Sequence, residues 1–358
     1  MKSLSAIGGI LFICLACGVS GTAARGQTMQ EDLQTAIDAG ELPGLHSVVV
    51  TLDQEIIGEA YFAGADERWG TSLGIVKHGP DTLHDARSVT KSVVGLLYGI
   101  ALGDGLVPGL DTPILSLFPE YEDLRDGSDR EKITVRNALT LQMGTEWNEN
   151  LPYSDPRNSE IAMENAPDRY RYVLEQPMVD IPGTEWSYNG GAVALIGKLI
   201  ADGAGMPLDD FAKDRLFEPL GIRDFDWVHS HDNVPSAASG LRLTARDLAK
   251  IGGLVANGGR HDGRQIVPES WLEASFVPAS MIQDGFFYGF LWYLADGPGG
   301  DRLVIAVGNG GQRLTVQPKA GFVVSIFAGN YNDPEAWRVS LDVLLKHAIP
   351  AAKNHMSR

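Results

Sequence analysis

A serine and a lysine three residues apart stand at the start of an apolar run, and this pair constrains the fold most. Ser88 and Lys91 open the stretch, and the residues after Lys91 are apolar or small as far as Leu102. Gly103 and Gly105 then favour the end of a helix. Because residues three apart share one face of a helix, the sequence predicts a buried helix with both side chains in its first turn.

The same pair suggests nucleophilic catalysis. A serine hydroxyl needs a neighbouring base before it can attack a carbonyl. A lysine amine has a pKa of about 10.4 in water, and burial, which disfavours the ammonium, is expected to lower it. The start of a helix also stabilises a developing oxyanion. The alternative, a helix-start serine beside a solvated lysine, fits less well because Lys91 interrupts an apolar run.

The first residues, 1–24, have the composition of a secretory signal peptide. A basic residue precedes an apolar stretch at 7–19, and small residues suited to cleavage follow. We therefore expect a secreted or periplasmic protein, with lipoprotein anchoring through Cys17 as the alternative. Cys14 and Cys17 are the two cysteines of the sequence, so a cleaved chain would have no disulfide and no thiolate metal site.

The charge and composition of the chain limit the classes of molecule that we expect it to bind. The net charge of −17 over 358 residues argues against nucleic acid and against anionic lipid surfaces. No segment after the leader is long and apolar enough to span a bilayer. The chain is long enough for a sizeable core. We expect a small-molecule substrate, with no cofactor and no metal.

The pattern of elements predicts an α+β fold. Alternating residues at 46–53 and 55–62 indicate a hairpin near the start, and short β-rich runs follow Tyr288. The simplest arrangement is one antiparallel sheet of about five strands, built from both ends of the chain, with helices on both faces. The expected division is a sheet subdomain of residues 25–105 plus 258–358 and a mainly helical subdomain of residues 106–257.

Other segments are assigned by capping residues, periodicity and breakers. Segments 70–81 and 150–167 are polar or interrupted by glycine and proline, so we expect loops there. Helices are predicted over 31–39, 134–143, 170–175, 191–204, 208–216, 244–257, 268–276 and 335–349.

Two further stretches carry groups suited to acyl chemistry. Tyr188 lies in a polar loop before an apolar helix, where its hydroxyl can relay a proton, although a loop tyrosine that only forms hydrogen bonds is the alternative. Residues 308–313 combine glycines with entry into a strand. A backbone N–H there can pair with the N–H of Ser88 as an oxyanion hole, while a tight hairpin turn explains the same glycines.

Taken in order, these stretches resemble the penicillin-recognising serine hydrolases. The subgroup is that of class C β-lactamases, D-Ala-D-Ala carboxypeptidases, carboxylesterases and aminohexanoate-dimer hydrolases. The stretches AASGLRLTARD at 237–247, NGGRHDGRQIVP at 257–268 and YGFLW at 288–292 are similar to segments common in that family. The resemblance covers nearly all of the chain after the leader, and it implies a β-lactamase/transpeptidase-like fold.

The resemblance also implies roles for individual residues. Ser88 would be the acylated nucleophile, Lys91 its base and Tyr188 the proton relay. The backbone N–H of Gln312 would join that of Ser88 in the oxyanion hole.

The sequence departs from the family pattern at two substrate-binding positions. The family's Tyr-x-Asn reads Tyr188-Asn189-Gly190, so the amide that would hold a substrate amide is missing at its place. The Lys-Thr-Gly or His-x-Gly of β-lactamases and peptidases reads Gly310-Gly311, without a cation, and Arg313 is the candidate replacement. We assign substrate contact to Asn189, Gly190, Gly310, Gly311 and Arg313.

These departures favour small uncharged esters as substrates. An ester leaving group needs less protonation and less orientation than an amide. The alternatives are an amide or peptide hydrolase, which includes aminohexanoate-dimer-like, D-Ala-D-Ala carboxypeptidase and β-lactamase activities, and a non-catalytic penicillin-binding-like receptor.

Two rival motifs are weaker. Residues 70–74 match the Gly-x-Ser-x-Gly elbow of α/β-hydrolases, but a polar stretch precedes them and Gly79-Pro80 leaves no room for the helix that should follow. The cluster from His229 to Asp232 offers metal-ligand types, but its spacing is that of a polar loop.

Overall fold

The computed structural model of the protein describes residues 28–297 and 300–357, so the predicted leader, 1–24, lies outside the described residues. The chain divides into two compact units. The first comprises Met1–Val89, Arg242–Gly258 and Leu294–Arg358, and the second comprises Thr90–Leu241 and Gly259–Tyr293. These boundaries differ from the expected division at 105/106 and 257/258. The Ser88 helix from Thr90 onward and residues 259–293 group with the second unit, whereas residues 242–258 group with the first.

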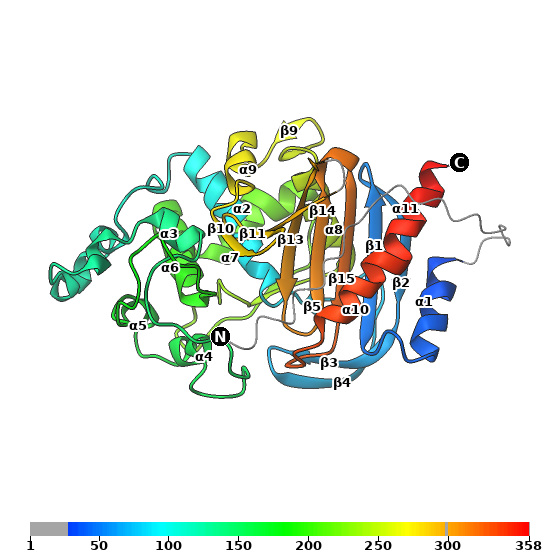
Figure 1. The fold of residues 1–358 in the computed structure, drawn as a ribbon, viewed down its shortest axis with the longest axis horizontal. Helices are drawn as coiled ribbons and strands as arrows, with labels where there is room; N and C mark the ends of the chain where they lie inside the picture. Colours follow the sequence, from blue (N-terminus) through cyan, green and yellow to red (C-terminus); the bar gives the residue numbers. More distant parts are fainter. Residues whose placement is uncertain (1–27, 298–299, 358) are drawn as a thin grey trace. The chain divides into compact units, whose positions relative to one another are not determined.

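An antiparallel sheet forms the first unit, as predicted. Its strands lie in the order β12-β13-β14-β15-β1-β2 (Figure 1). The first and last strands in sequence pair directly, with Leu45 opposite Ala328 and Leu52 opposite Phe322. The strands are β1 (Leu45–Leu52), β2 (Glu55–Tyr61), β12 (Tyr293–Asp296), β13 (Arg302–Gly308), β14 (Gln312–Gln317) and β15 (Phe322–Ala328).

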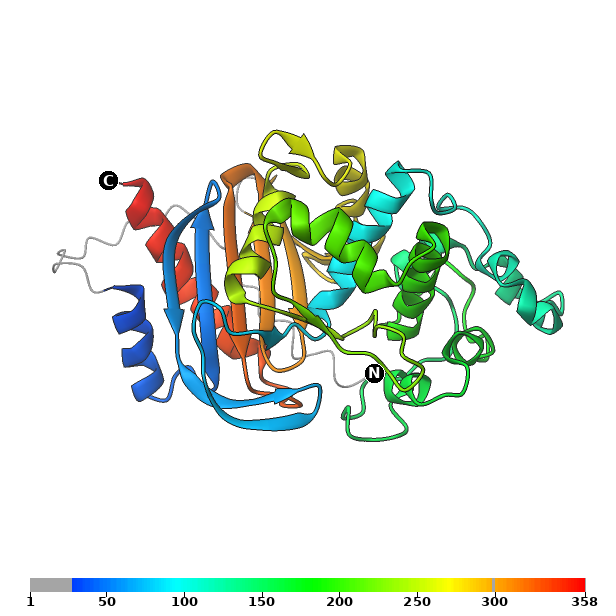
Figure 2. The ribbon, with the colours of Figure 1, turned by 180° about the vertical axis from the view of Figure 1, so that it is seen from behind.

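Helices cover both faces of this sheet, which is why β14 and β15 are buried throughout. Figure 1 shows the face crossed by α10 (Trp337–Asp342) and α11 (Ile349–Met356), and Figure 2 shows α8 (Ala245–Ala256) on the opposite face. Between α10 and α11 lies η9 (Val343–Ala348), and α1 (Met29–Asp38) packs beside β2. The apolar core on that side is formed by Leu33, Leu42, Val48, Val50, Ala60, Val324, Ile326, Val343 and Leu344.

Two small pairings complete the first unit. A hairpin joins β3 (Ala63–Arg68) to β4 (Thr71–Lys77), and β5 (His84–Asp85) pairs with β7 (Leu241–Leu243). The expectation of a loop over 70–81 is therefore wrong, because β4 runs through it. Ser72 of the rival elbow lies exposed within this strand and not at a strand-to-helix turn, so the α/β-hydrolase reading is excluded.

The second unit is mainly helical, as predicted for most of the middle of the chain. Its helices and turns are α2 (Val89–Gly103), η2 (Ile114–Leu117), η3 (Pro119–Leu124), η4 (Asp129–Lys132), α3 (Val135–Leu139), α4 (Ser159–Glu164), α5 (Arg169–Leu174), α6 (Gly190–Ala204), α7 (Leu208–Ala212), η5 (Lys213–Phe217), η6 (Glu218–Leu220) and α9 (Glu269–Ser275). Short strands are β6 (Asp226–Trp227), β8 (Arg260–His261), β9 (Arg264–Gln265), β10 (Ser280–Gln283) and β11 (Phe286–Tyr288). In the first unit, the short turn η8 (Pro318–Ala320) lies between β14 and β15.

One predicted loop of this unit contains a helix. Helix α4 begins within the segment 150–167, where the Asn158 side chain caps it by accepting hydrogen bonds from the backbone N–H groups of Glu160 and Ile161. Glu160 and Glu164 are buried. The expectation of a surface loop is wrong here because local capping and buried partners outweigh the polar composition.

Within the part of the chain that is described, no single helix is long and apolar enough to cross a membrane. One pair, Gly190–Ala204 with Leu208–Leu220, reaches the required length and composition only when taken together, and it is bent by 76°.

Candidate active site

Ser88 occupies a tight turn between β5 and α2. The turn closes through a 3.2 Å hydrogen bond from the Val89 N–H to the Ala86 carbonyl. Arg87 has a φ of 50°, in the left-handed region that a side chain makes unfavourable. The helix begins at Val89, so Ser88 lies just before the first turn and not within it. The Ser88 side chain is largely buried at 8% exposure.

An ion-pair network in the first unit holds this turn in its strained conformation. The Arg87 guanidinium pairs with Glu67 and, at 3.1 Å, with Asp85. It also lies 4.8 Å from the ring centroid of Tyr331. Asp85 forms a second ion pair with the Arg242 guanidinium, at 2.8 Å. A left-handed residue persists where its surroundings fix it, so these contacts place the nucleophile.

The ends of β13 and β14 pack against the Ser88 turn within the same unit. Gly308 pairs with Gln312, and a Cβ on Gly308 would lie 2.5 Å from the Ala86 carbonyl oxygen. This closeness brings the backbone of Gln312 beside the nucleophile's turn. The Gln312 side chain is fully buried and bonds the Ala328 backbone in both directions, so it fixes the strand end. The arrangement fits an oxyanion hole of the Ser88 and Gln312 N–H groups, which stays a prediction.

The glycine turn before β14 offers no cation. Gly310 and Gly311 have φ values of 97° and 98°, a conformation that favours glycine over the lysine or histidine of the family pattern. Arg313 does not replace the missing charge at this turn, because its guanidinium donates to Ser340 Oγ of α10 at 3.2 Å. Burial lowers the pKa of Arg313 to about 10.

Lys91 and Tyr188 lie together in the second unit. The Lys91 ammonium is 4.9 Å from the centroid of the Tyr188 ring, and it donates to the Ala238 carbonyl at 3.0 Å. It also donates to Glu160 Oε2 at 3.4 Å. Lys91 is 2% exposed, so its charge is compensated by these groups and hardly by water.

Two glutamates that the sequence analysis missed surround this lysine. Glu160 accepts a 2.6 Å hydrogen bond from Ser239 Oγ. Glu149 accepts hydrogen bonds from Trp147 Nε1 at 2.6 Å, the Gly190 N–H at 2.5 Å and Tyr153 Oη at 3.0 Å. Although Glu149 as a residue is partly exposed, its carboxylate lies among these donors. The signal available in the sequence was the Asn-Ser-Glu start of α4, which indicates a cap followed by a carboxylate.

These carboxylates reverse the expected pKa shift of the lysine. Burial alone lowers the pKa of Lys91, but the charges of Glu160, Tyr188 and Glu149 outweigh it and raise the pKa above its ordinary value. Withdrawal from water and the neighbouring Glu160 raise the pKa of Glu149 to about 7. Glu160 is buried, which by itself raises its pKa, yet Lys91 and its hydrogen bonds hold that pKa below the ordinary value. The resting site is therefore a lysine ammonium beside Glu160 carboxylate.

Asn189 and Gly190, which follow Tyr188, are fixed by contacts with α6 and with the two glutamates. Asn189 caps α6 by accepting a 3.0 Å hydrogen bond from the Ala192 N–H, and it is buried, so its side chain does not stand in for the absent amide. A Cβ on Gly190 would lie 2.7 Å from Glu160 Oε2 and 3.0 Å from Glu149 Oε1. The glutamates thus occupy the space that a side chain at position 190 would need.

The residues His229 to Asp232 form a loop and not a metal site. His229 contacts Asp209 at 2.9 Å, His231 Nδ1 lies 3.0 Å from the Glu164 carbonyl oxygen, and Asp232 pairs with Arg169 at 2.7 Å. Their polar atoms are directed to separate partners, as the loop interpretation expected.

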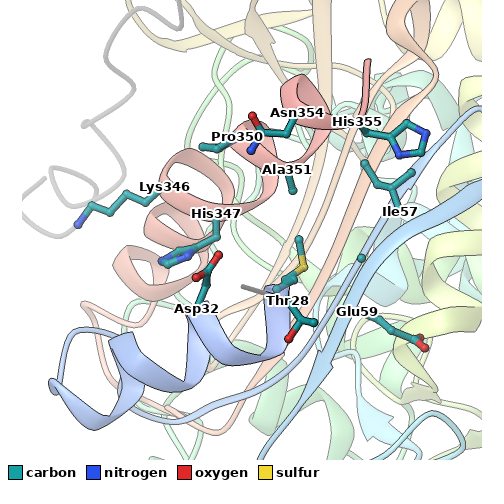
Figure 3. Close-up of a pocket in the computed structure, with 12 residues that line it drawn as sticks. Thr28, Asp32, Ile57, Glu59, Lys346, His347, Pro350, Ala351, Asn354 and His355 are labelled. Atoms are coloured by element: carbon teal, nitrogen blue, oxygen red, sulfur yellow. The ribbon is translucent and has the colours of Figure 1, made fainter. Parts of the chain in front are cut away.

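A pocket of about 460 Å³ in the first unit is lined by α1, β2 and the C-terminal helices (Figure 3). None of the residues assigned to catalysis lines it. His347 and Asp32 face one another across its lower part in Figure 3. Burial lowers the pKa of His347, although the charge of Asp32 acts in the opposite direction.

Comparison with known proteins matches the chain to one family and its fold to solved structures of similar architecture. The family model described as beta-lactamase matches residues 29–345. The chain is 24% identical to 6-aminohexanoate-dimer hydrolase of Paenarthrobacter ureafaciens over 309 residues, which are 80% of this chain and 73% of that protein. It is 27% identical to lovastatin esterase of Penicillium rubens over 260 residues, 64% of this chain and 60% of that protein. The fold matches simvastatin synthase from Aspergillus terreus with a TM-score of 0.65 at 18% identity, over 93% of this chain and 100% of that chain.

Proposed function

Because the chain belongs to the beta-lactamase family of serine hydrolases, we propose that it hydrolyses small, uncharged esters through an acyl-enzyme on Ser88. The observation that carries the proposal is the buried Lys91, which follows Ser88 by three residues, contacts Tyr188 and Glu160, and is influenced by the charge of Glu149. In the first step, Ser88 Oγ bonds to the carbonyl carbon and the bond to the alcohol breaks. The serine proton passes to the departing alkoxide. Water then releases the acid and regenerates Ser88.

Lys91 and Tyr188 carry the protons. A lysine that rests as an ammonium becomes a base only after it gives up a proton, and Glu160 Oε2 at 3.4 Å is an acceptor within reach. That transfer leaves a neutral amine beside a neutral carboxyl group, so no net charge is created in the buried site. Tyr188, over whose ring the Lys91 ammonium lies, relays the serine proton to the leaving group.

The surroundings support an ester over an amide or an acid. Gly190 brings no side-chain amide to orient a substrate amide, and the two glutamates fill its side of the site. Gly310 and Gly311 bring no cation for a substrate carboxylate. The acidic pair, like the net charge of −17, works against anionic substrates. The name of the relative lovastatin esterase agrees with this preference, and that of 6-aminohexanoate-dimer hydrolase keeps amides as the second candidate.

Covalent labelling tests the nucleophile. Intact-mass spectrometry after incubation with a fluorophosphonate should show one adduct per chain, absent from Ser88→Ala. Ser72→Ala is the matched control, since Ser72 is exposed on β4, and it should label like the wild type. An adduct on Ser88→Ala, or none on the wild type, would refute the mechanism.

A substrate panel tests the preference. On one preparation, kcat/KM is compared for p-nitrophenyl butyrate, nitrocefin and a D-Ala-D-Ala peptide, with Ser88→Ala as blank. The ester should lead. Nitrocefin or the peptide turning over faster would reject the ester assignment while leaving the serine mechanism intact.

We also propose that the chain is exported and cleaved near Arg25, on the strength of the basic, apolar and small residues of 1–24. Cell fractionation with N-terminal sequencing tests this. A cytoplasmic protein that retains Met1 would contradict it.

A further inference from the structure

Three histidines and an aspartate meet inside the first unit, apart from the residues assigned to hydrolysis. His46 comes from β1, Asp66 from β3, His78 follows β4, and His84 lies on β5. All four are buried, with exposures of 1%, 4%, 7% and 1% in that order. Each offers one nitrogen or carboxylate oxygen, and these four atoms lie within 4.8 Å of one another. The strands thus converge on one set of metal-ligating atoms.

Several of these atoms have no hydrogen-bond partner in the described part of the chain. They are His46 Nε2, His78 Nε2 and Asp66 Oδ2. A buried polar atom without a partner costs free energy, so such atoms seldom gather in one place without a reason. His78 Nε2 and Asp66 Oδ2 are 4.0 Å apart, too far for a hydrogen bond. A bound cation between His78 Nε2 and Asp66 Oδ2 would satisfy both of these atoms at once.

Hydrogen bonds at the edge of the cluster orient His84 and Asp66 so that each points a free donor atom toward the other residues. His84 Nδ1 lies 3.1 Å from the Asp85 carbonyl oxygen, so it carries the proton and leaves the Nε2 lone pair toward His46 and Asp66. Tyr331 Oη donates to Asp66 Oδ1 at 2.9 Å, which leaves Oδ2 for a ligand. Ligating imidazoles and carboxylates in metal sites are oriented by outer hydrogen bonds of this kind.

The ring of His46 is also fixed in place. It stacks on His78 with centroids 4.1 Å apart. A Cβ on Gly64 or on Gly329 would lie 2.4 Å from atoms of the His46 ring, so both backbones close tightly around it. The His46 ring is therefore held in one orientation toward the other three side chains.

We propose that His46, Asp66, His78 and His84 bind one divalent transition-metal ion, of which zinc fits the donor set best. Three imidazole nitrogens and one carboxylate oxygen suit a tetrahedral zinc site, in which donor atoms lie about 3.3 Å apart. His46 Nδ1 and His84 Nε2, 2.9 Å apart, already have this separation, so His46 would bind through Nδ1 once the proton of that hydrogen bond has left. The other donor atoms lie within 4.8 Å and reach the ion by rotation of their side chains.

Four protein donors leave no open position, so the ion is structural. It ties β1, the β3–β4 hairpin and β5 together, four residues before the nucleophile. This site does not depend on the proposed hydrolysis.

Metal binding to the whole chain tests the proposal. The protein is stripped with a chelator and titrated with Zn²⁺ by calorimetry and with Co²⁺ by visible spectroscopy. We expect one ion per chain, the intense visible band of tetrahedral Co²⁺, and a zinc-dependent rise in Tm of several degrees. Substoichiometric binding, or the weak spectrum of octahedral Co²⁺, would overturn the proposal.

Variants locate the site. His78→Gln and Asp66→Asn should weaken zinc binding by at least about tenfold. His355→Gln, at an exposed position on α11, is the matched control and should bind like the wild type. Equal losses in all three would place the ion elsewhere. If a buried variant fails to fold, the stoichiometry and Co²⁺ spectrum of the wild type still decide.

Discussion

Gly190 and Glu160 exclude one another's side chains: a Cβ on Gly190 would lie 2.7 Å from Glu160 Oε2. The position where the family pattern has an amide side chain is therefore glycine because a carboxylate group occupies the space. Gly190 and Glu160 therefore cannot be changed independently of one another.

The first prediction concerns this exclusion. Gly190→Ala should reduce kcat/KM for p-nitrophenyl butyrate by at least about tenfold and lower Tm, because the new methyl group displaces a buried carboxylate. Gly109→Ala is the control, since a Cβ there meets nothing within 4 Å. Equal activity of both variants would show that the glutamates move aside freely.

The second prediction concerns Lys91. Lys91→Met should lower kcat/KM by about three orders of magnitude or more, because it removes the base of a coupled unit. It should also destabilise the fold, since Glu160 then keeps a buried charge without its cation. Lys198→Met removes a partly exposed lysine of α6 that pairs with Asp202, and it should do neither. Steady-state kinetics and thermal unfolding measure both effects, and a Lys91→Met variant with wild-type kcat/KM would remove the lysine from the mechanism.

The third prediction is the pH dependence of the rate. Glu160 raises the pKa of Lys91, and it is also the proposed acceptor of the Lys91 proton. In Glu160→Gln that proton must leave to solvent, so kcat/KM should fall and should gain an acidic limb, set by the pKa of Lys91, that the wild type lacks. A variant with the rate and pH profile of the wild type would mean that Glu160 does not take the Lys91 proton. Glu146→Gln, at an exposed position in the same segment as Glu149, should leave the profile unchanged.

The fourth prediction is a stability effect of Glu149. Its folded pKa of about 7 lies above its ordinary value, so folding favours the protonated form. This contribution is complete below the ordinary carboxyl pKa and is lost as the pH rises through 7. Relative to Glu149→Gln, the wild type should therefore lose up to a few kcal/mol of stability between about pH 4.5 and pH 8. Urea unfolding across this range measures the difference, and a difference independent of pH would contradict the shift.

The fifth prediction concerns the nucleophile's turn. Gly308→Ala would bring a methyl group to within 2.5 Å of the Ala86 carbonyl oxygen, so the turn that carries Ser88 must shift. We expect kcat to fall by about tenfold or more, with a smaller change in KM, because small displacements of reacting groups act mainly on the chemical step. Gly79→Ala has its nearest contact at 3.9 Å and is the control. A fall confined to KM would place Gly308 in substrate binding.

Local signals predicted the long elements well. The apolar run after Lys91 gave α2, and the Thr244 cap gave α8 to within a residue or two at each end. The sheet followed from the alternation at both ends of the chain. Strand β4 was missed because Gly70 and Gly74 look like loop residues, although both adopt a positive φ within a hairpin.

The candidate site was predictable where the side chains are close in sequence and not where tertiary packing assembles them. Ser88 and Lys91 needed only helical spacing. The sign of the Lys91 pKa shift required Glu149 and Glu160, which stand far from it in sequence and arrive through folding. For the same reason nothing in the spacing of His46, His78 and His84 indicated that they meet.

The pairing of β1 with β15 has a consequence for synthesis. Residue 45 finds its partner only at residue 328, so a growing chain cannot complete the sheet until nearly all of it has been made. Until then β1 can pair only with β2, and the apolar side chains of β1 that later form the core stay exposed to water. Contacts this distant in sequence slow folding and leave strand edges open to other chains. In a chain of this topology, the edge of β1 therefore stays open to wrong pairing until β15 has been synthesised.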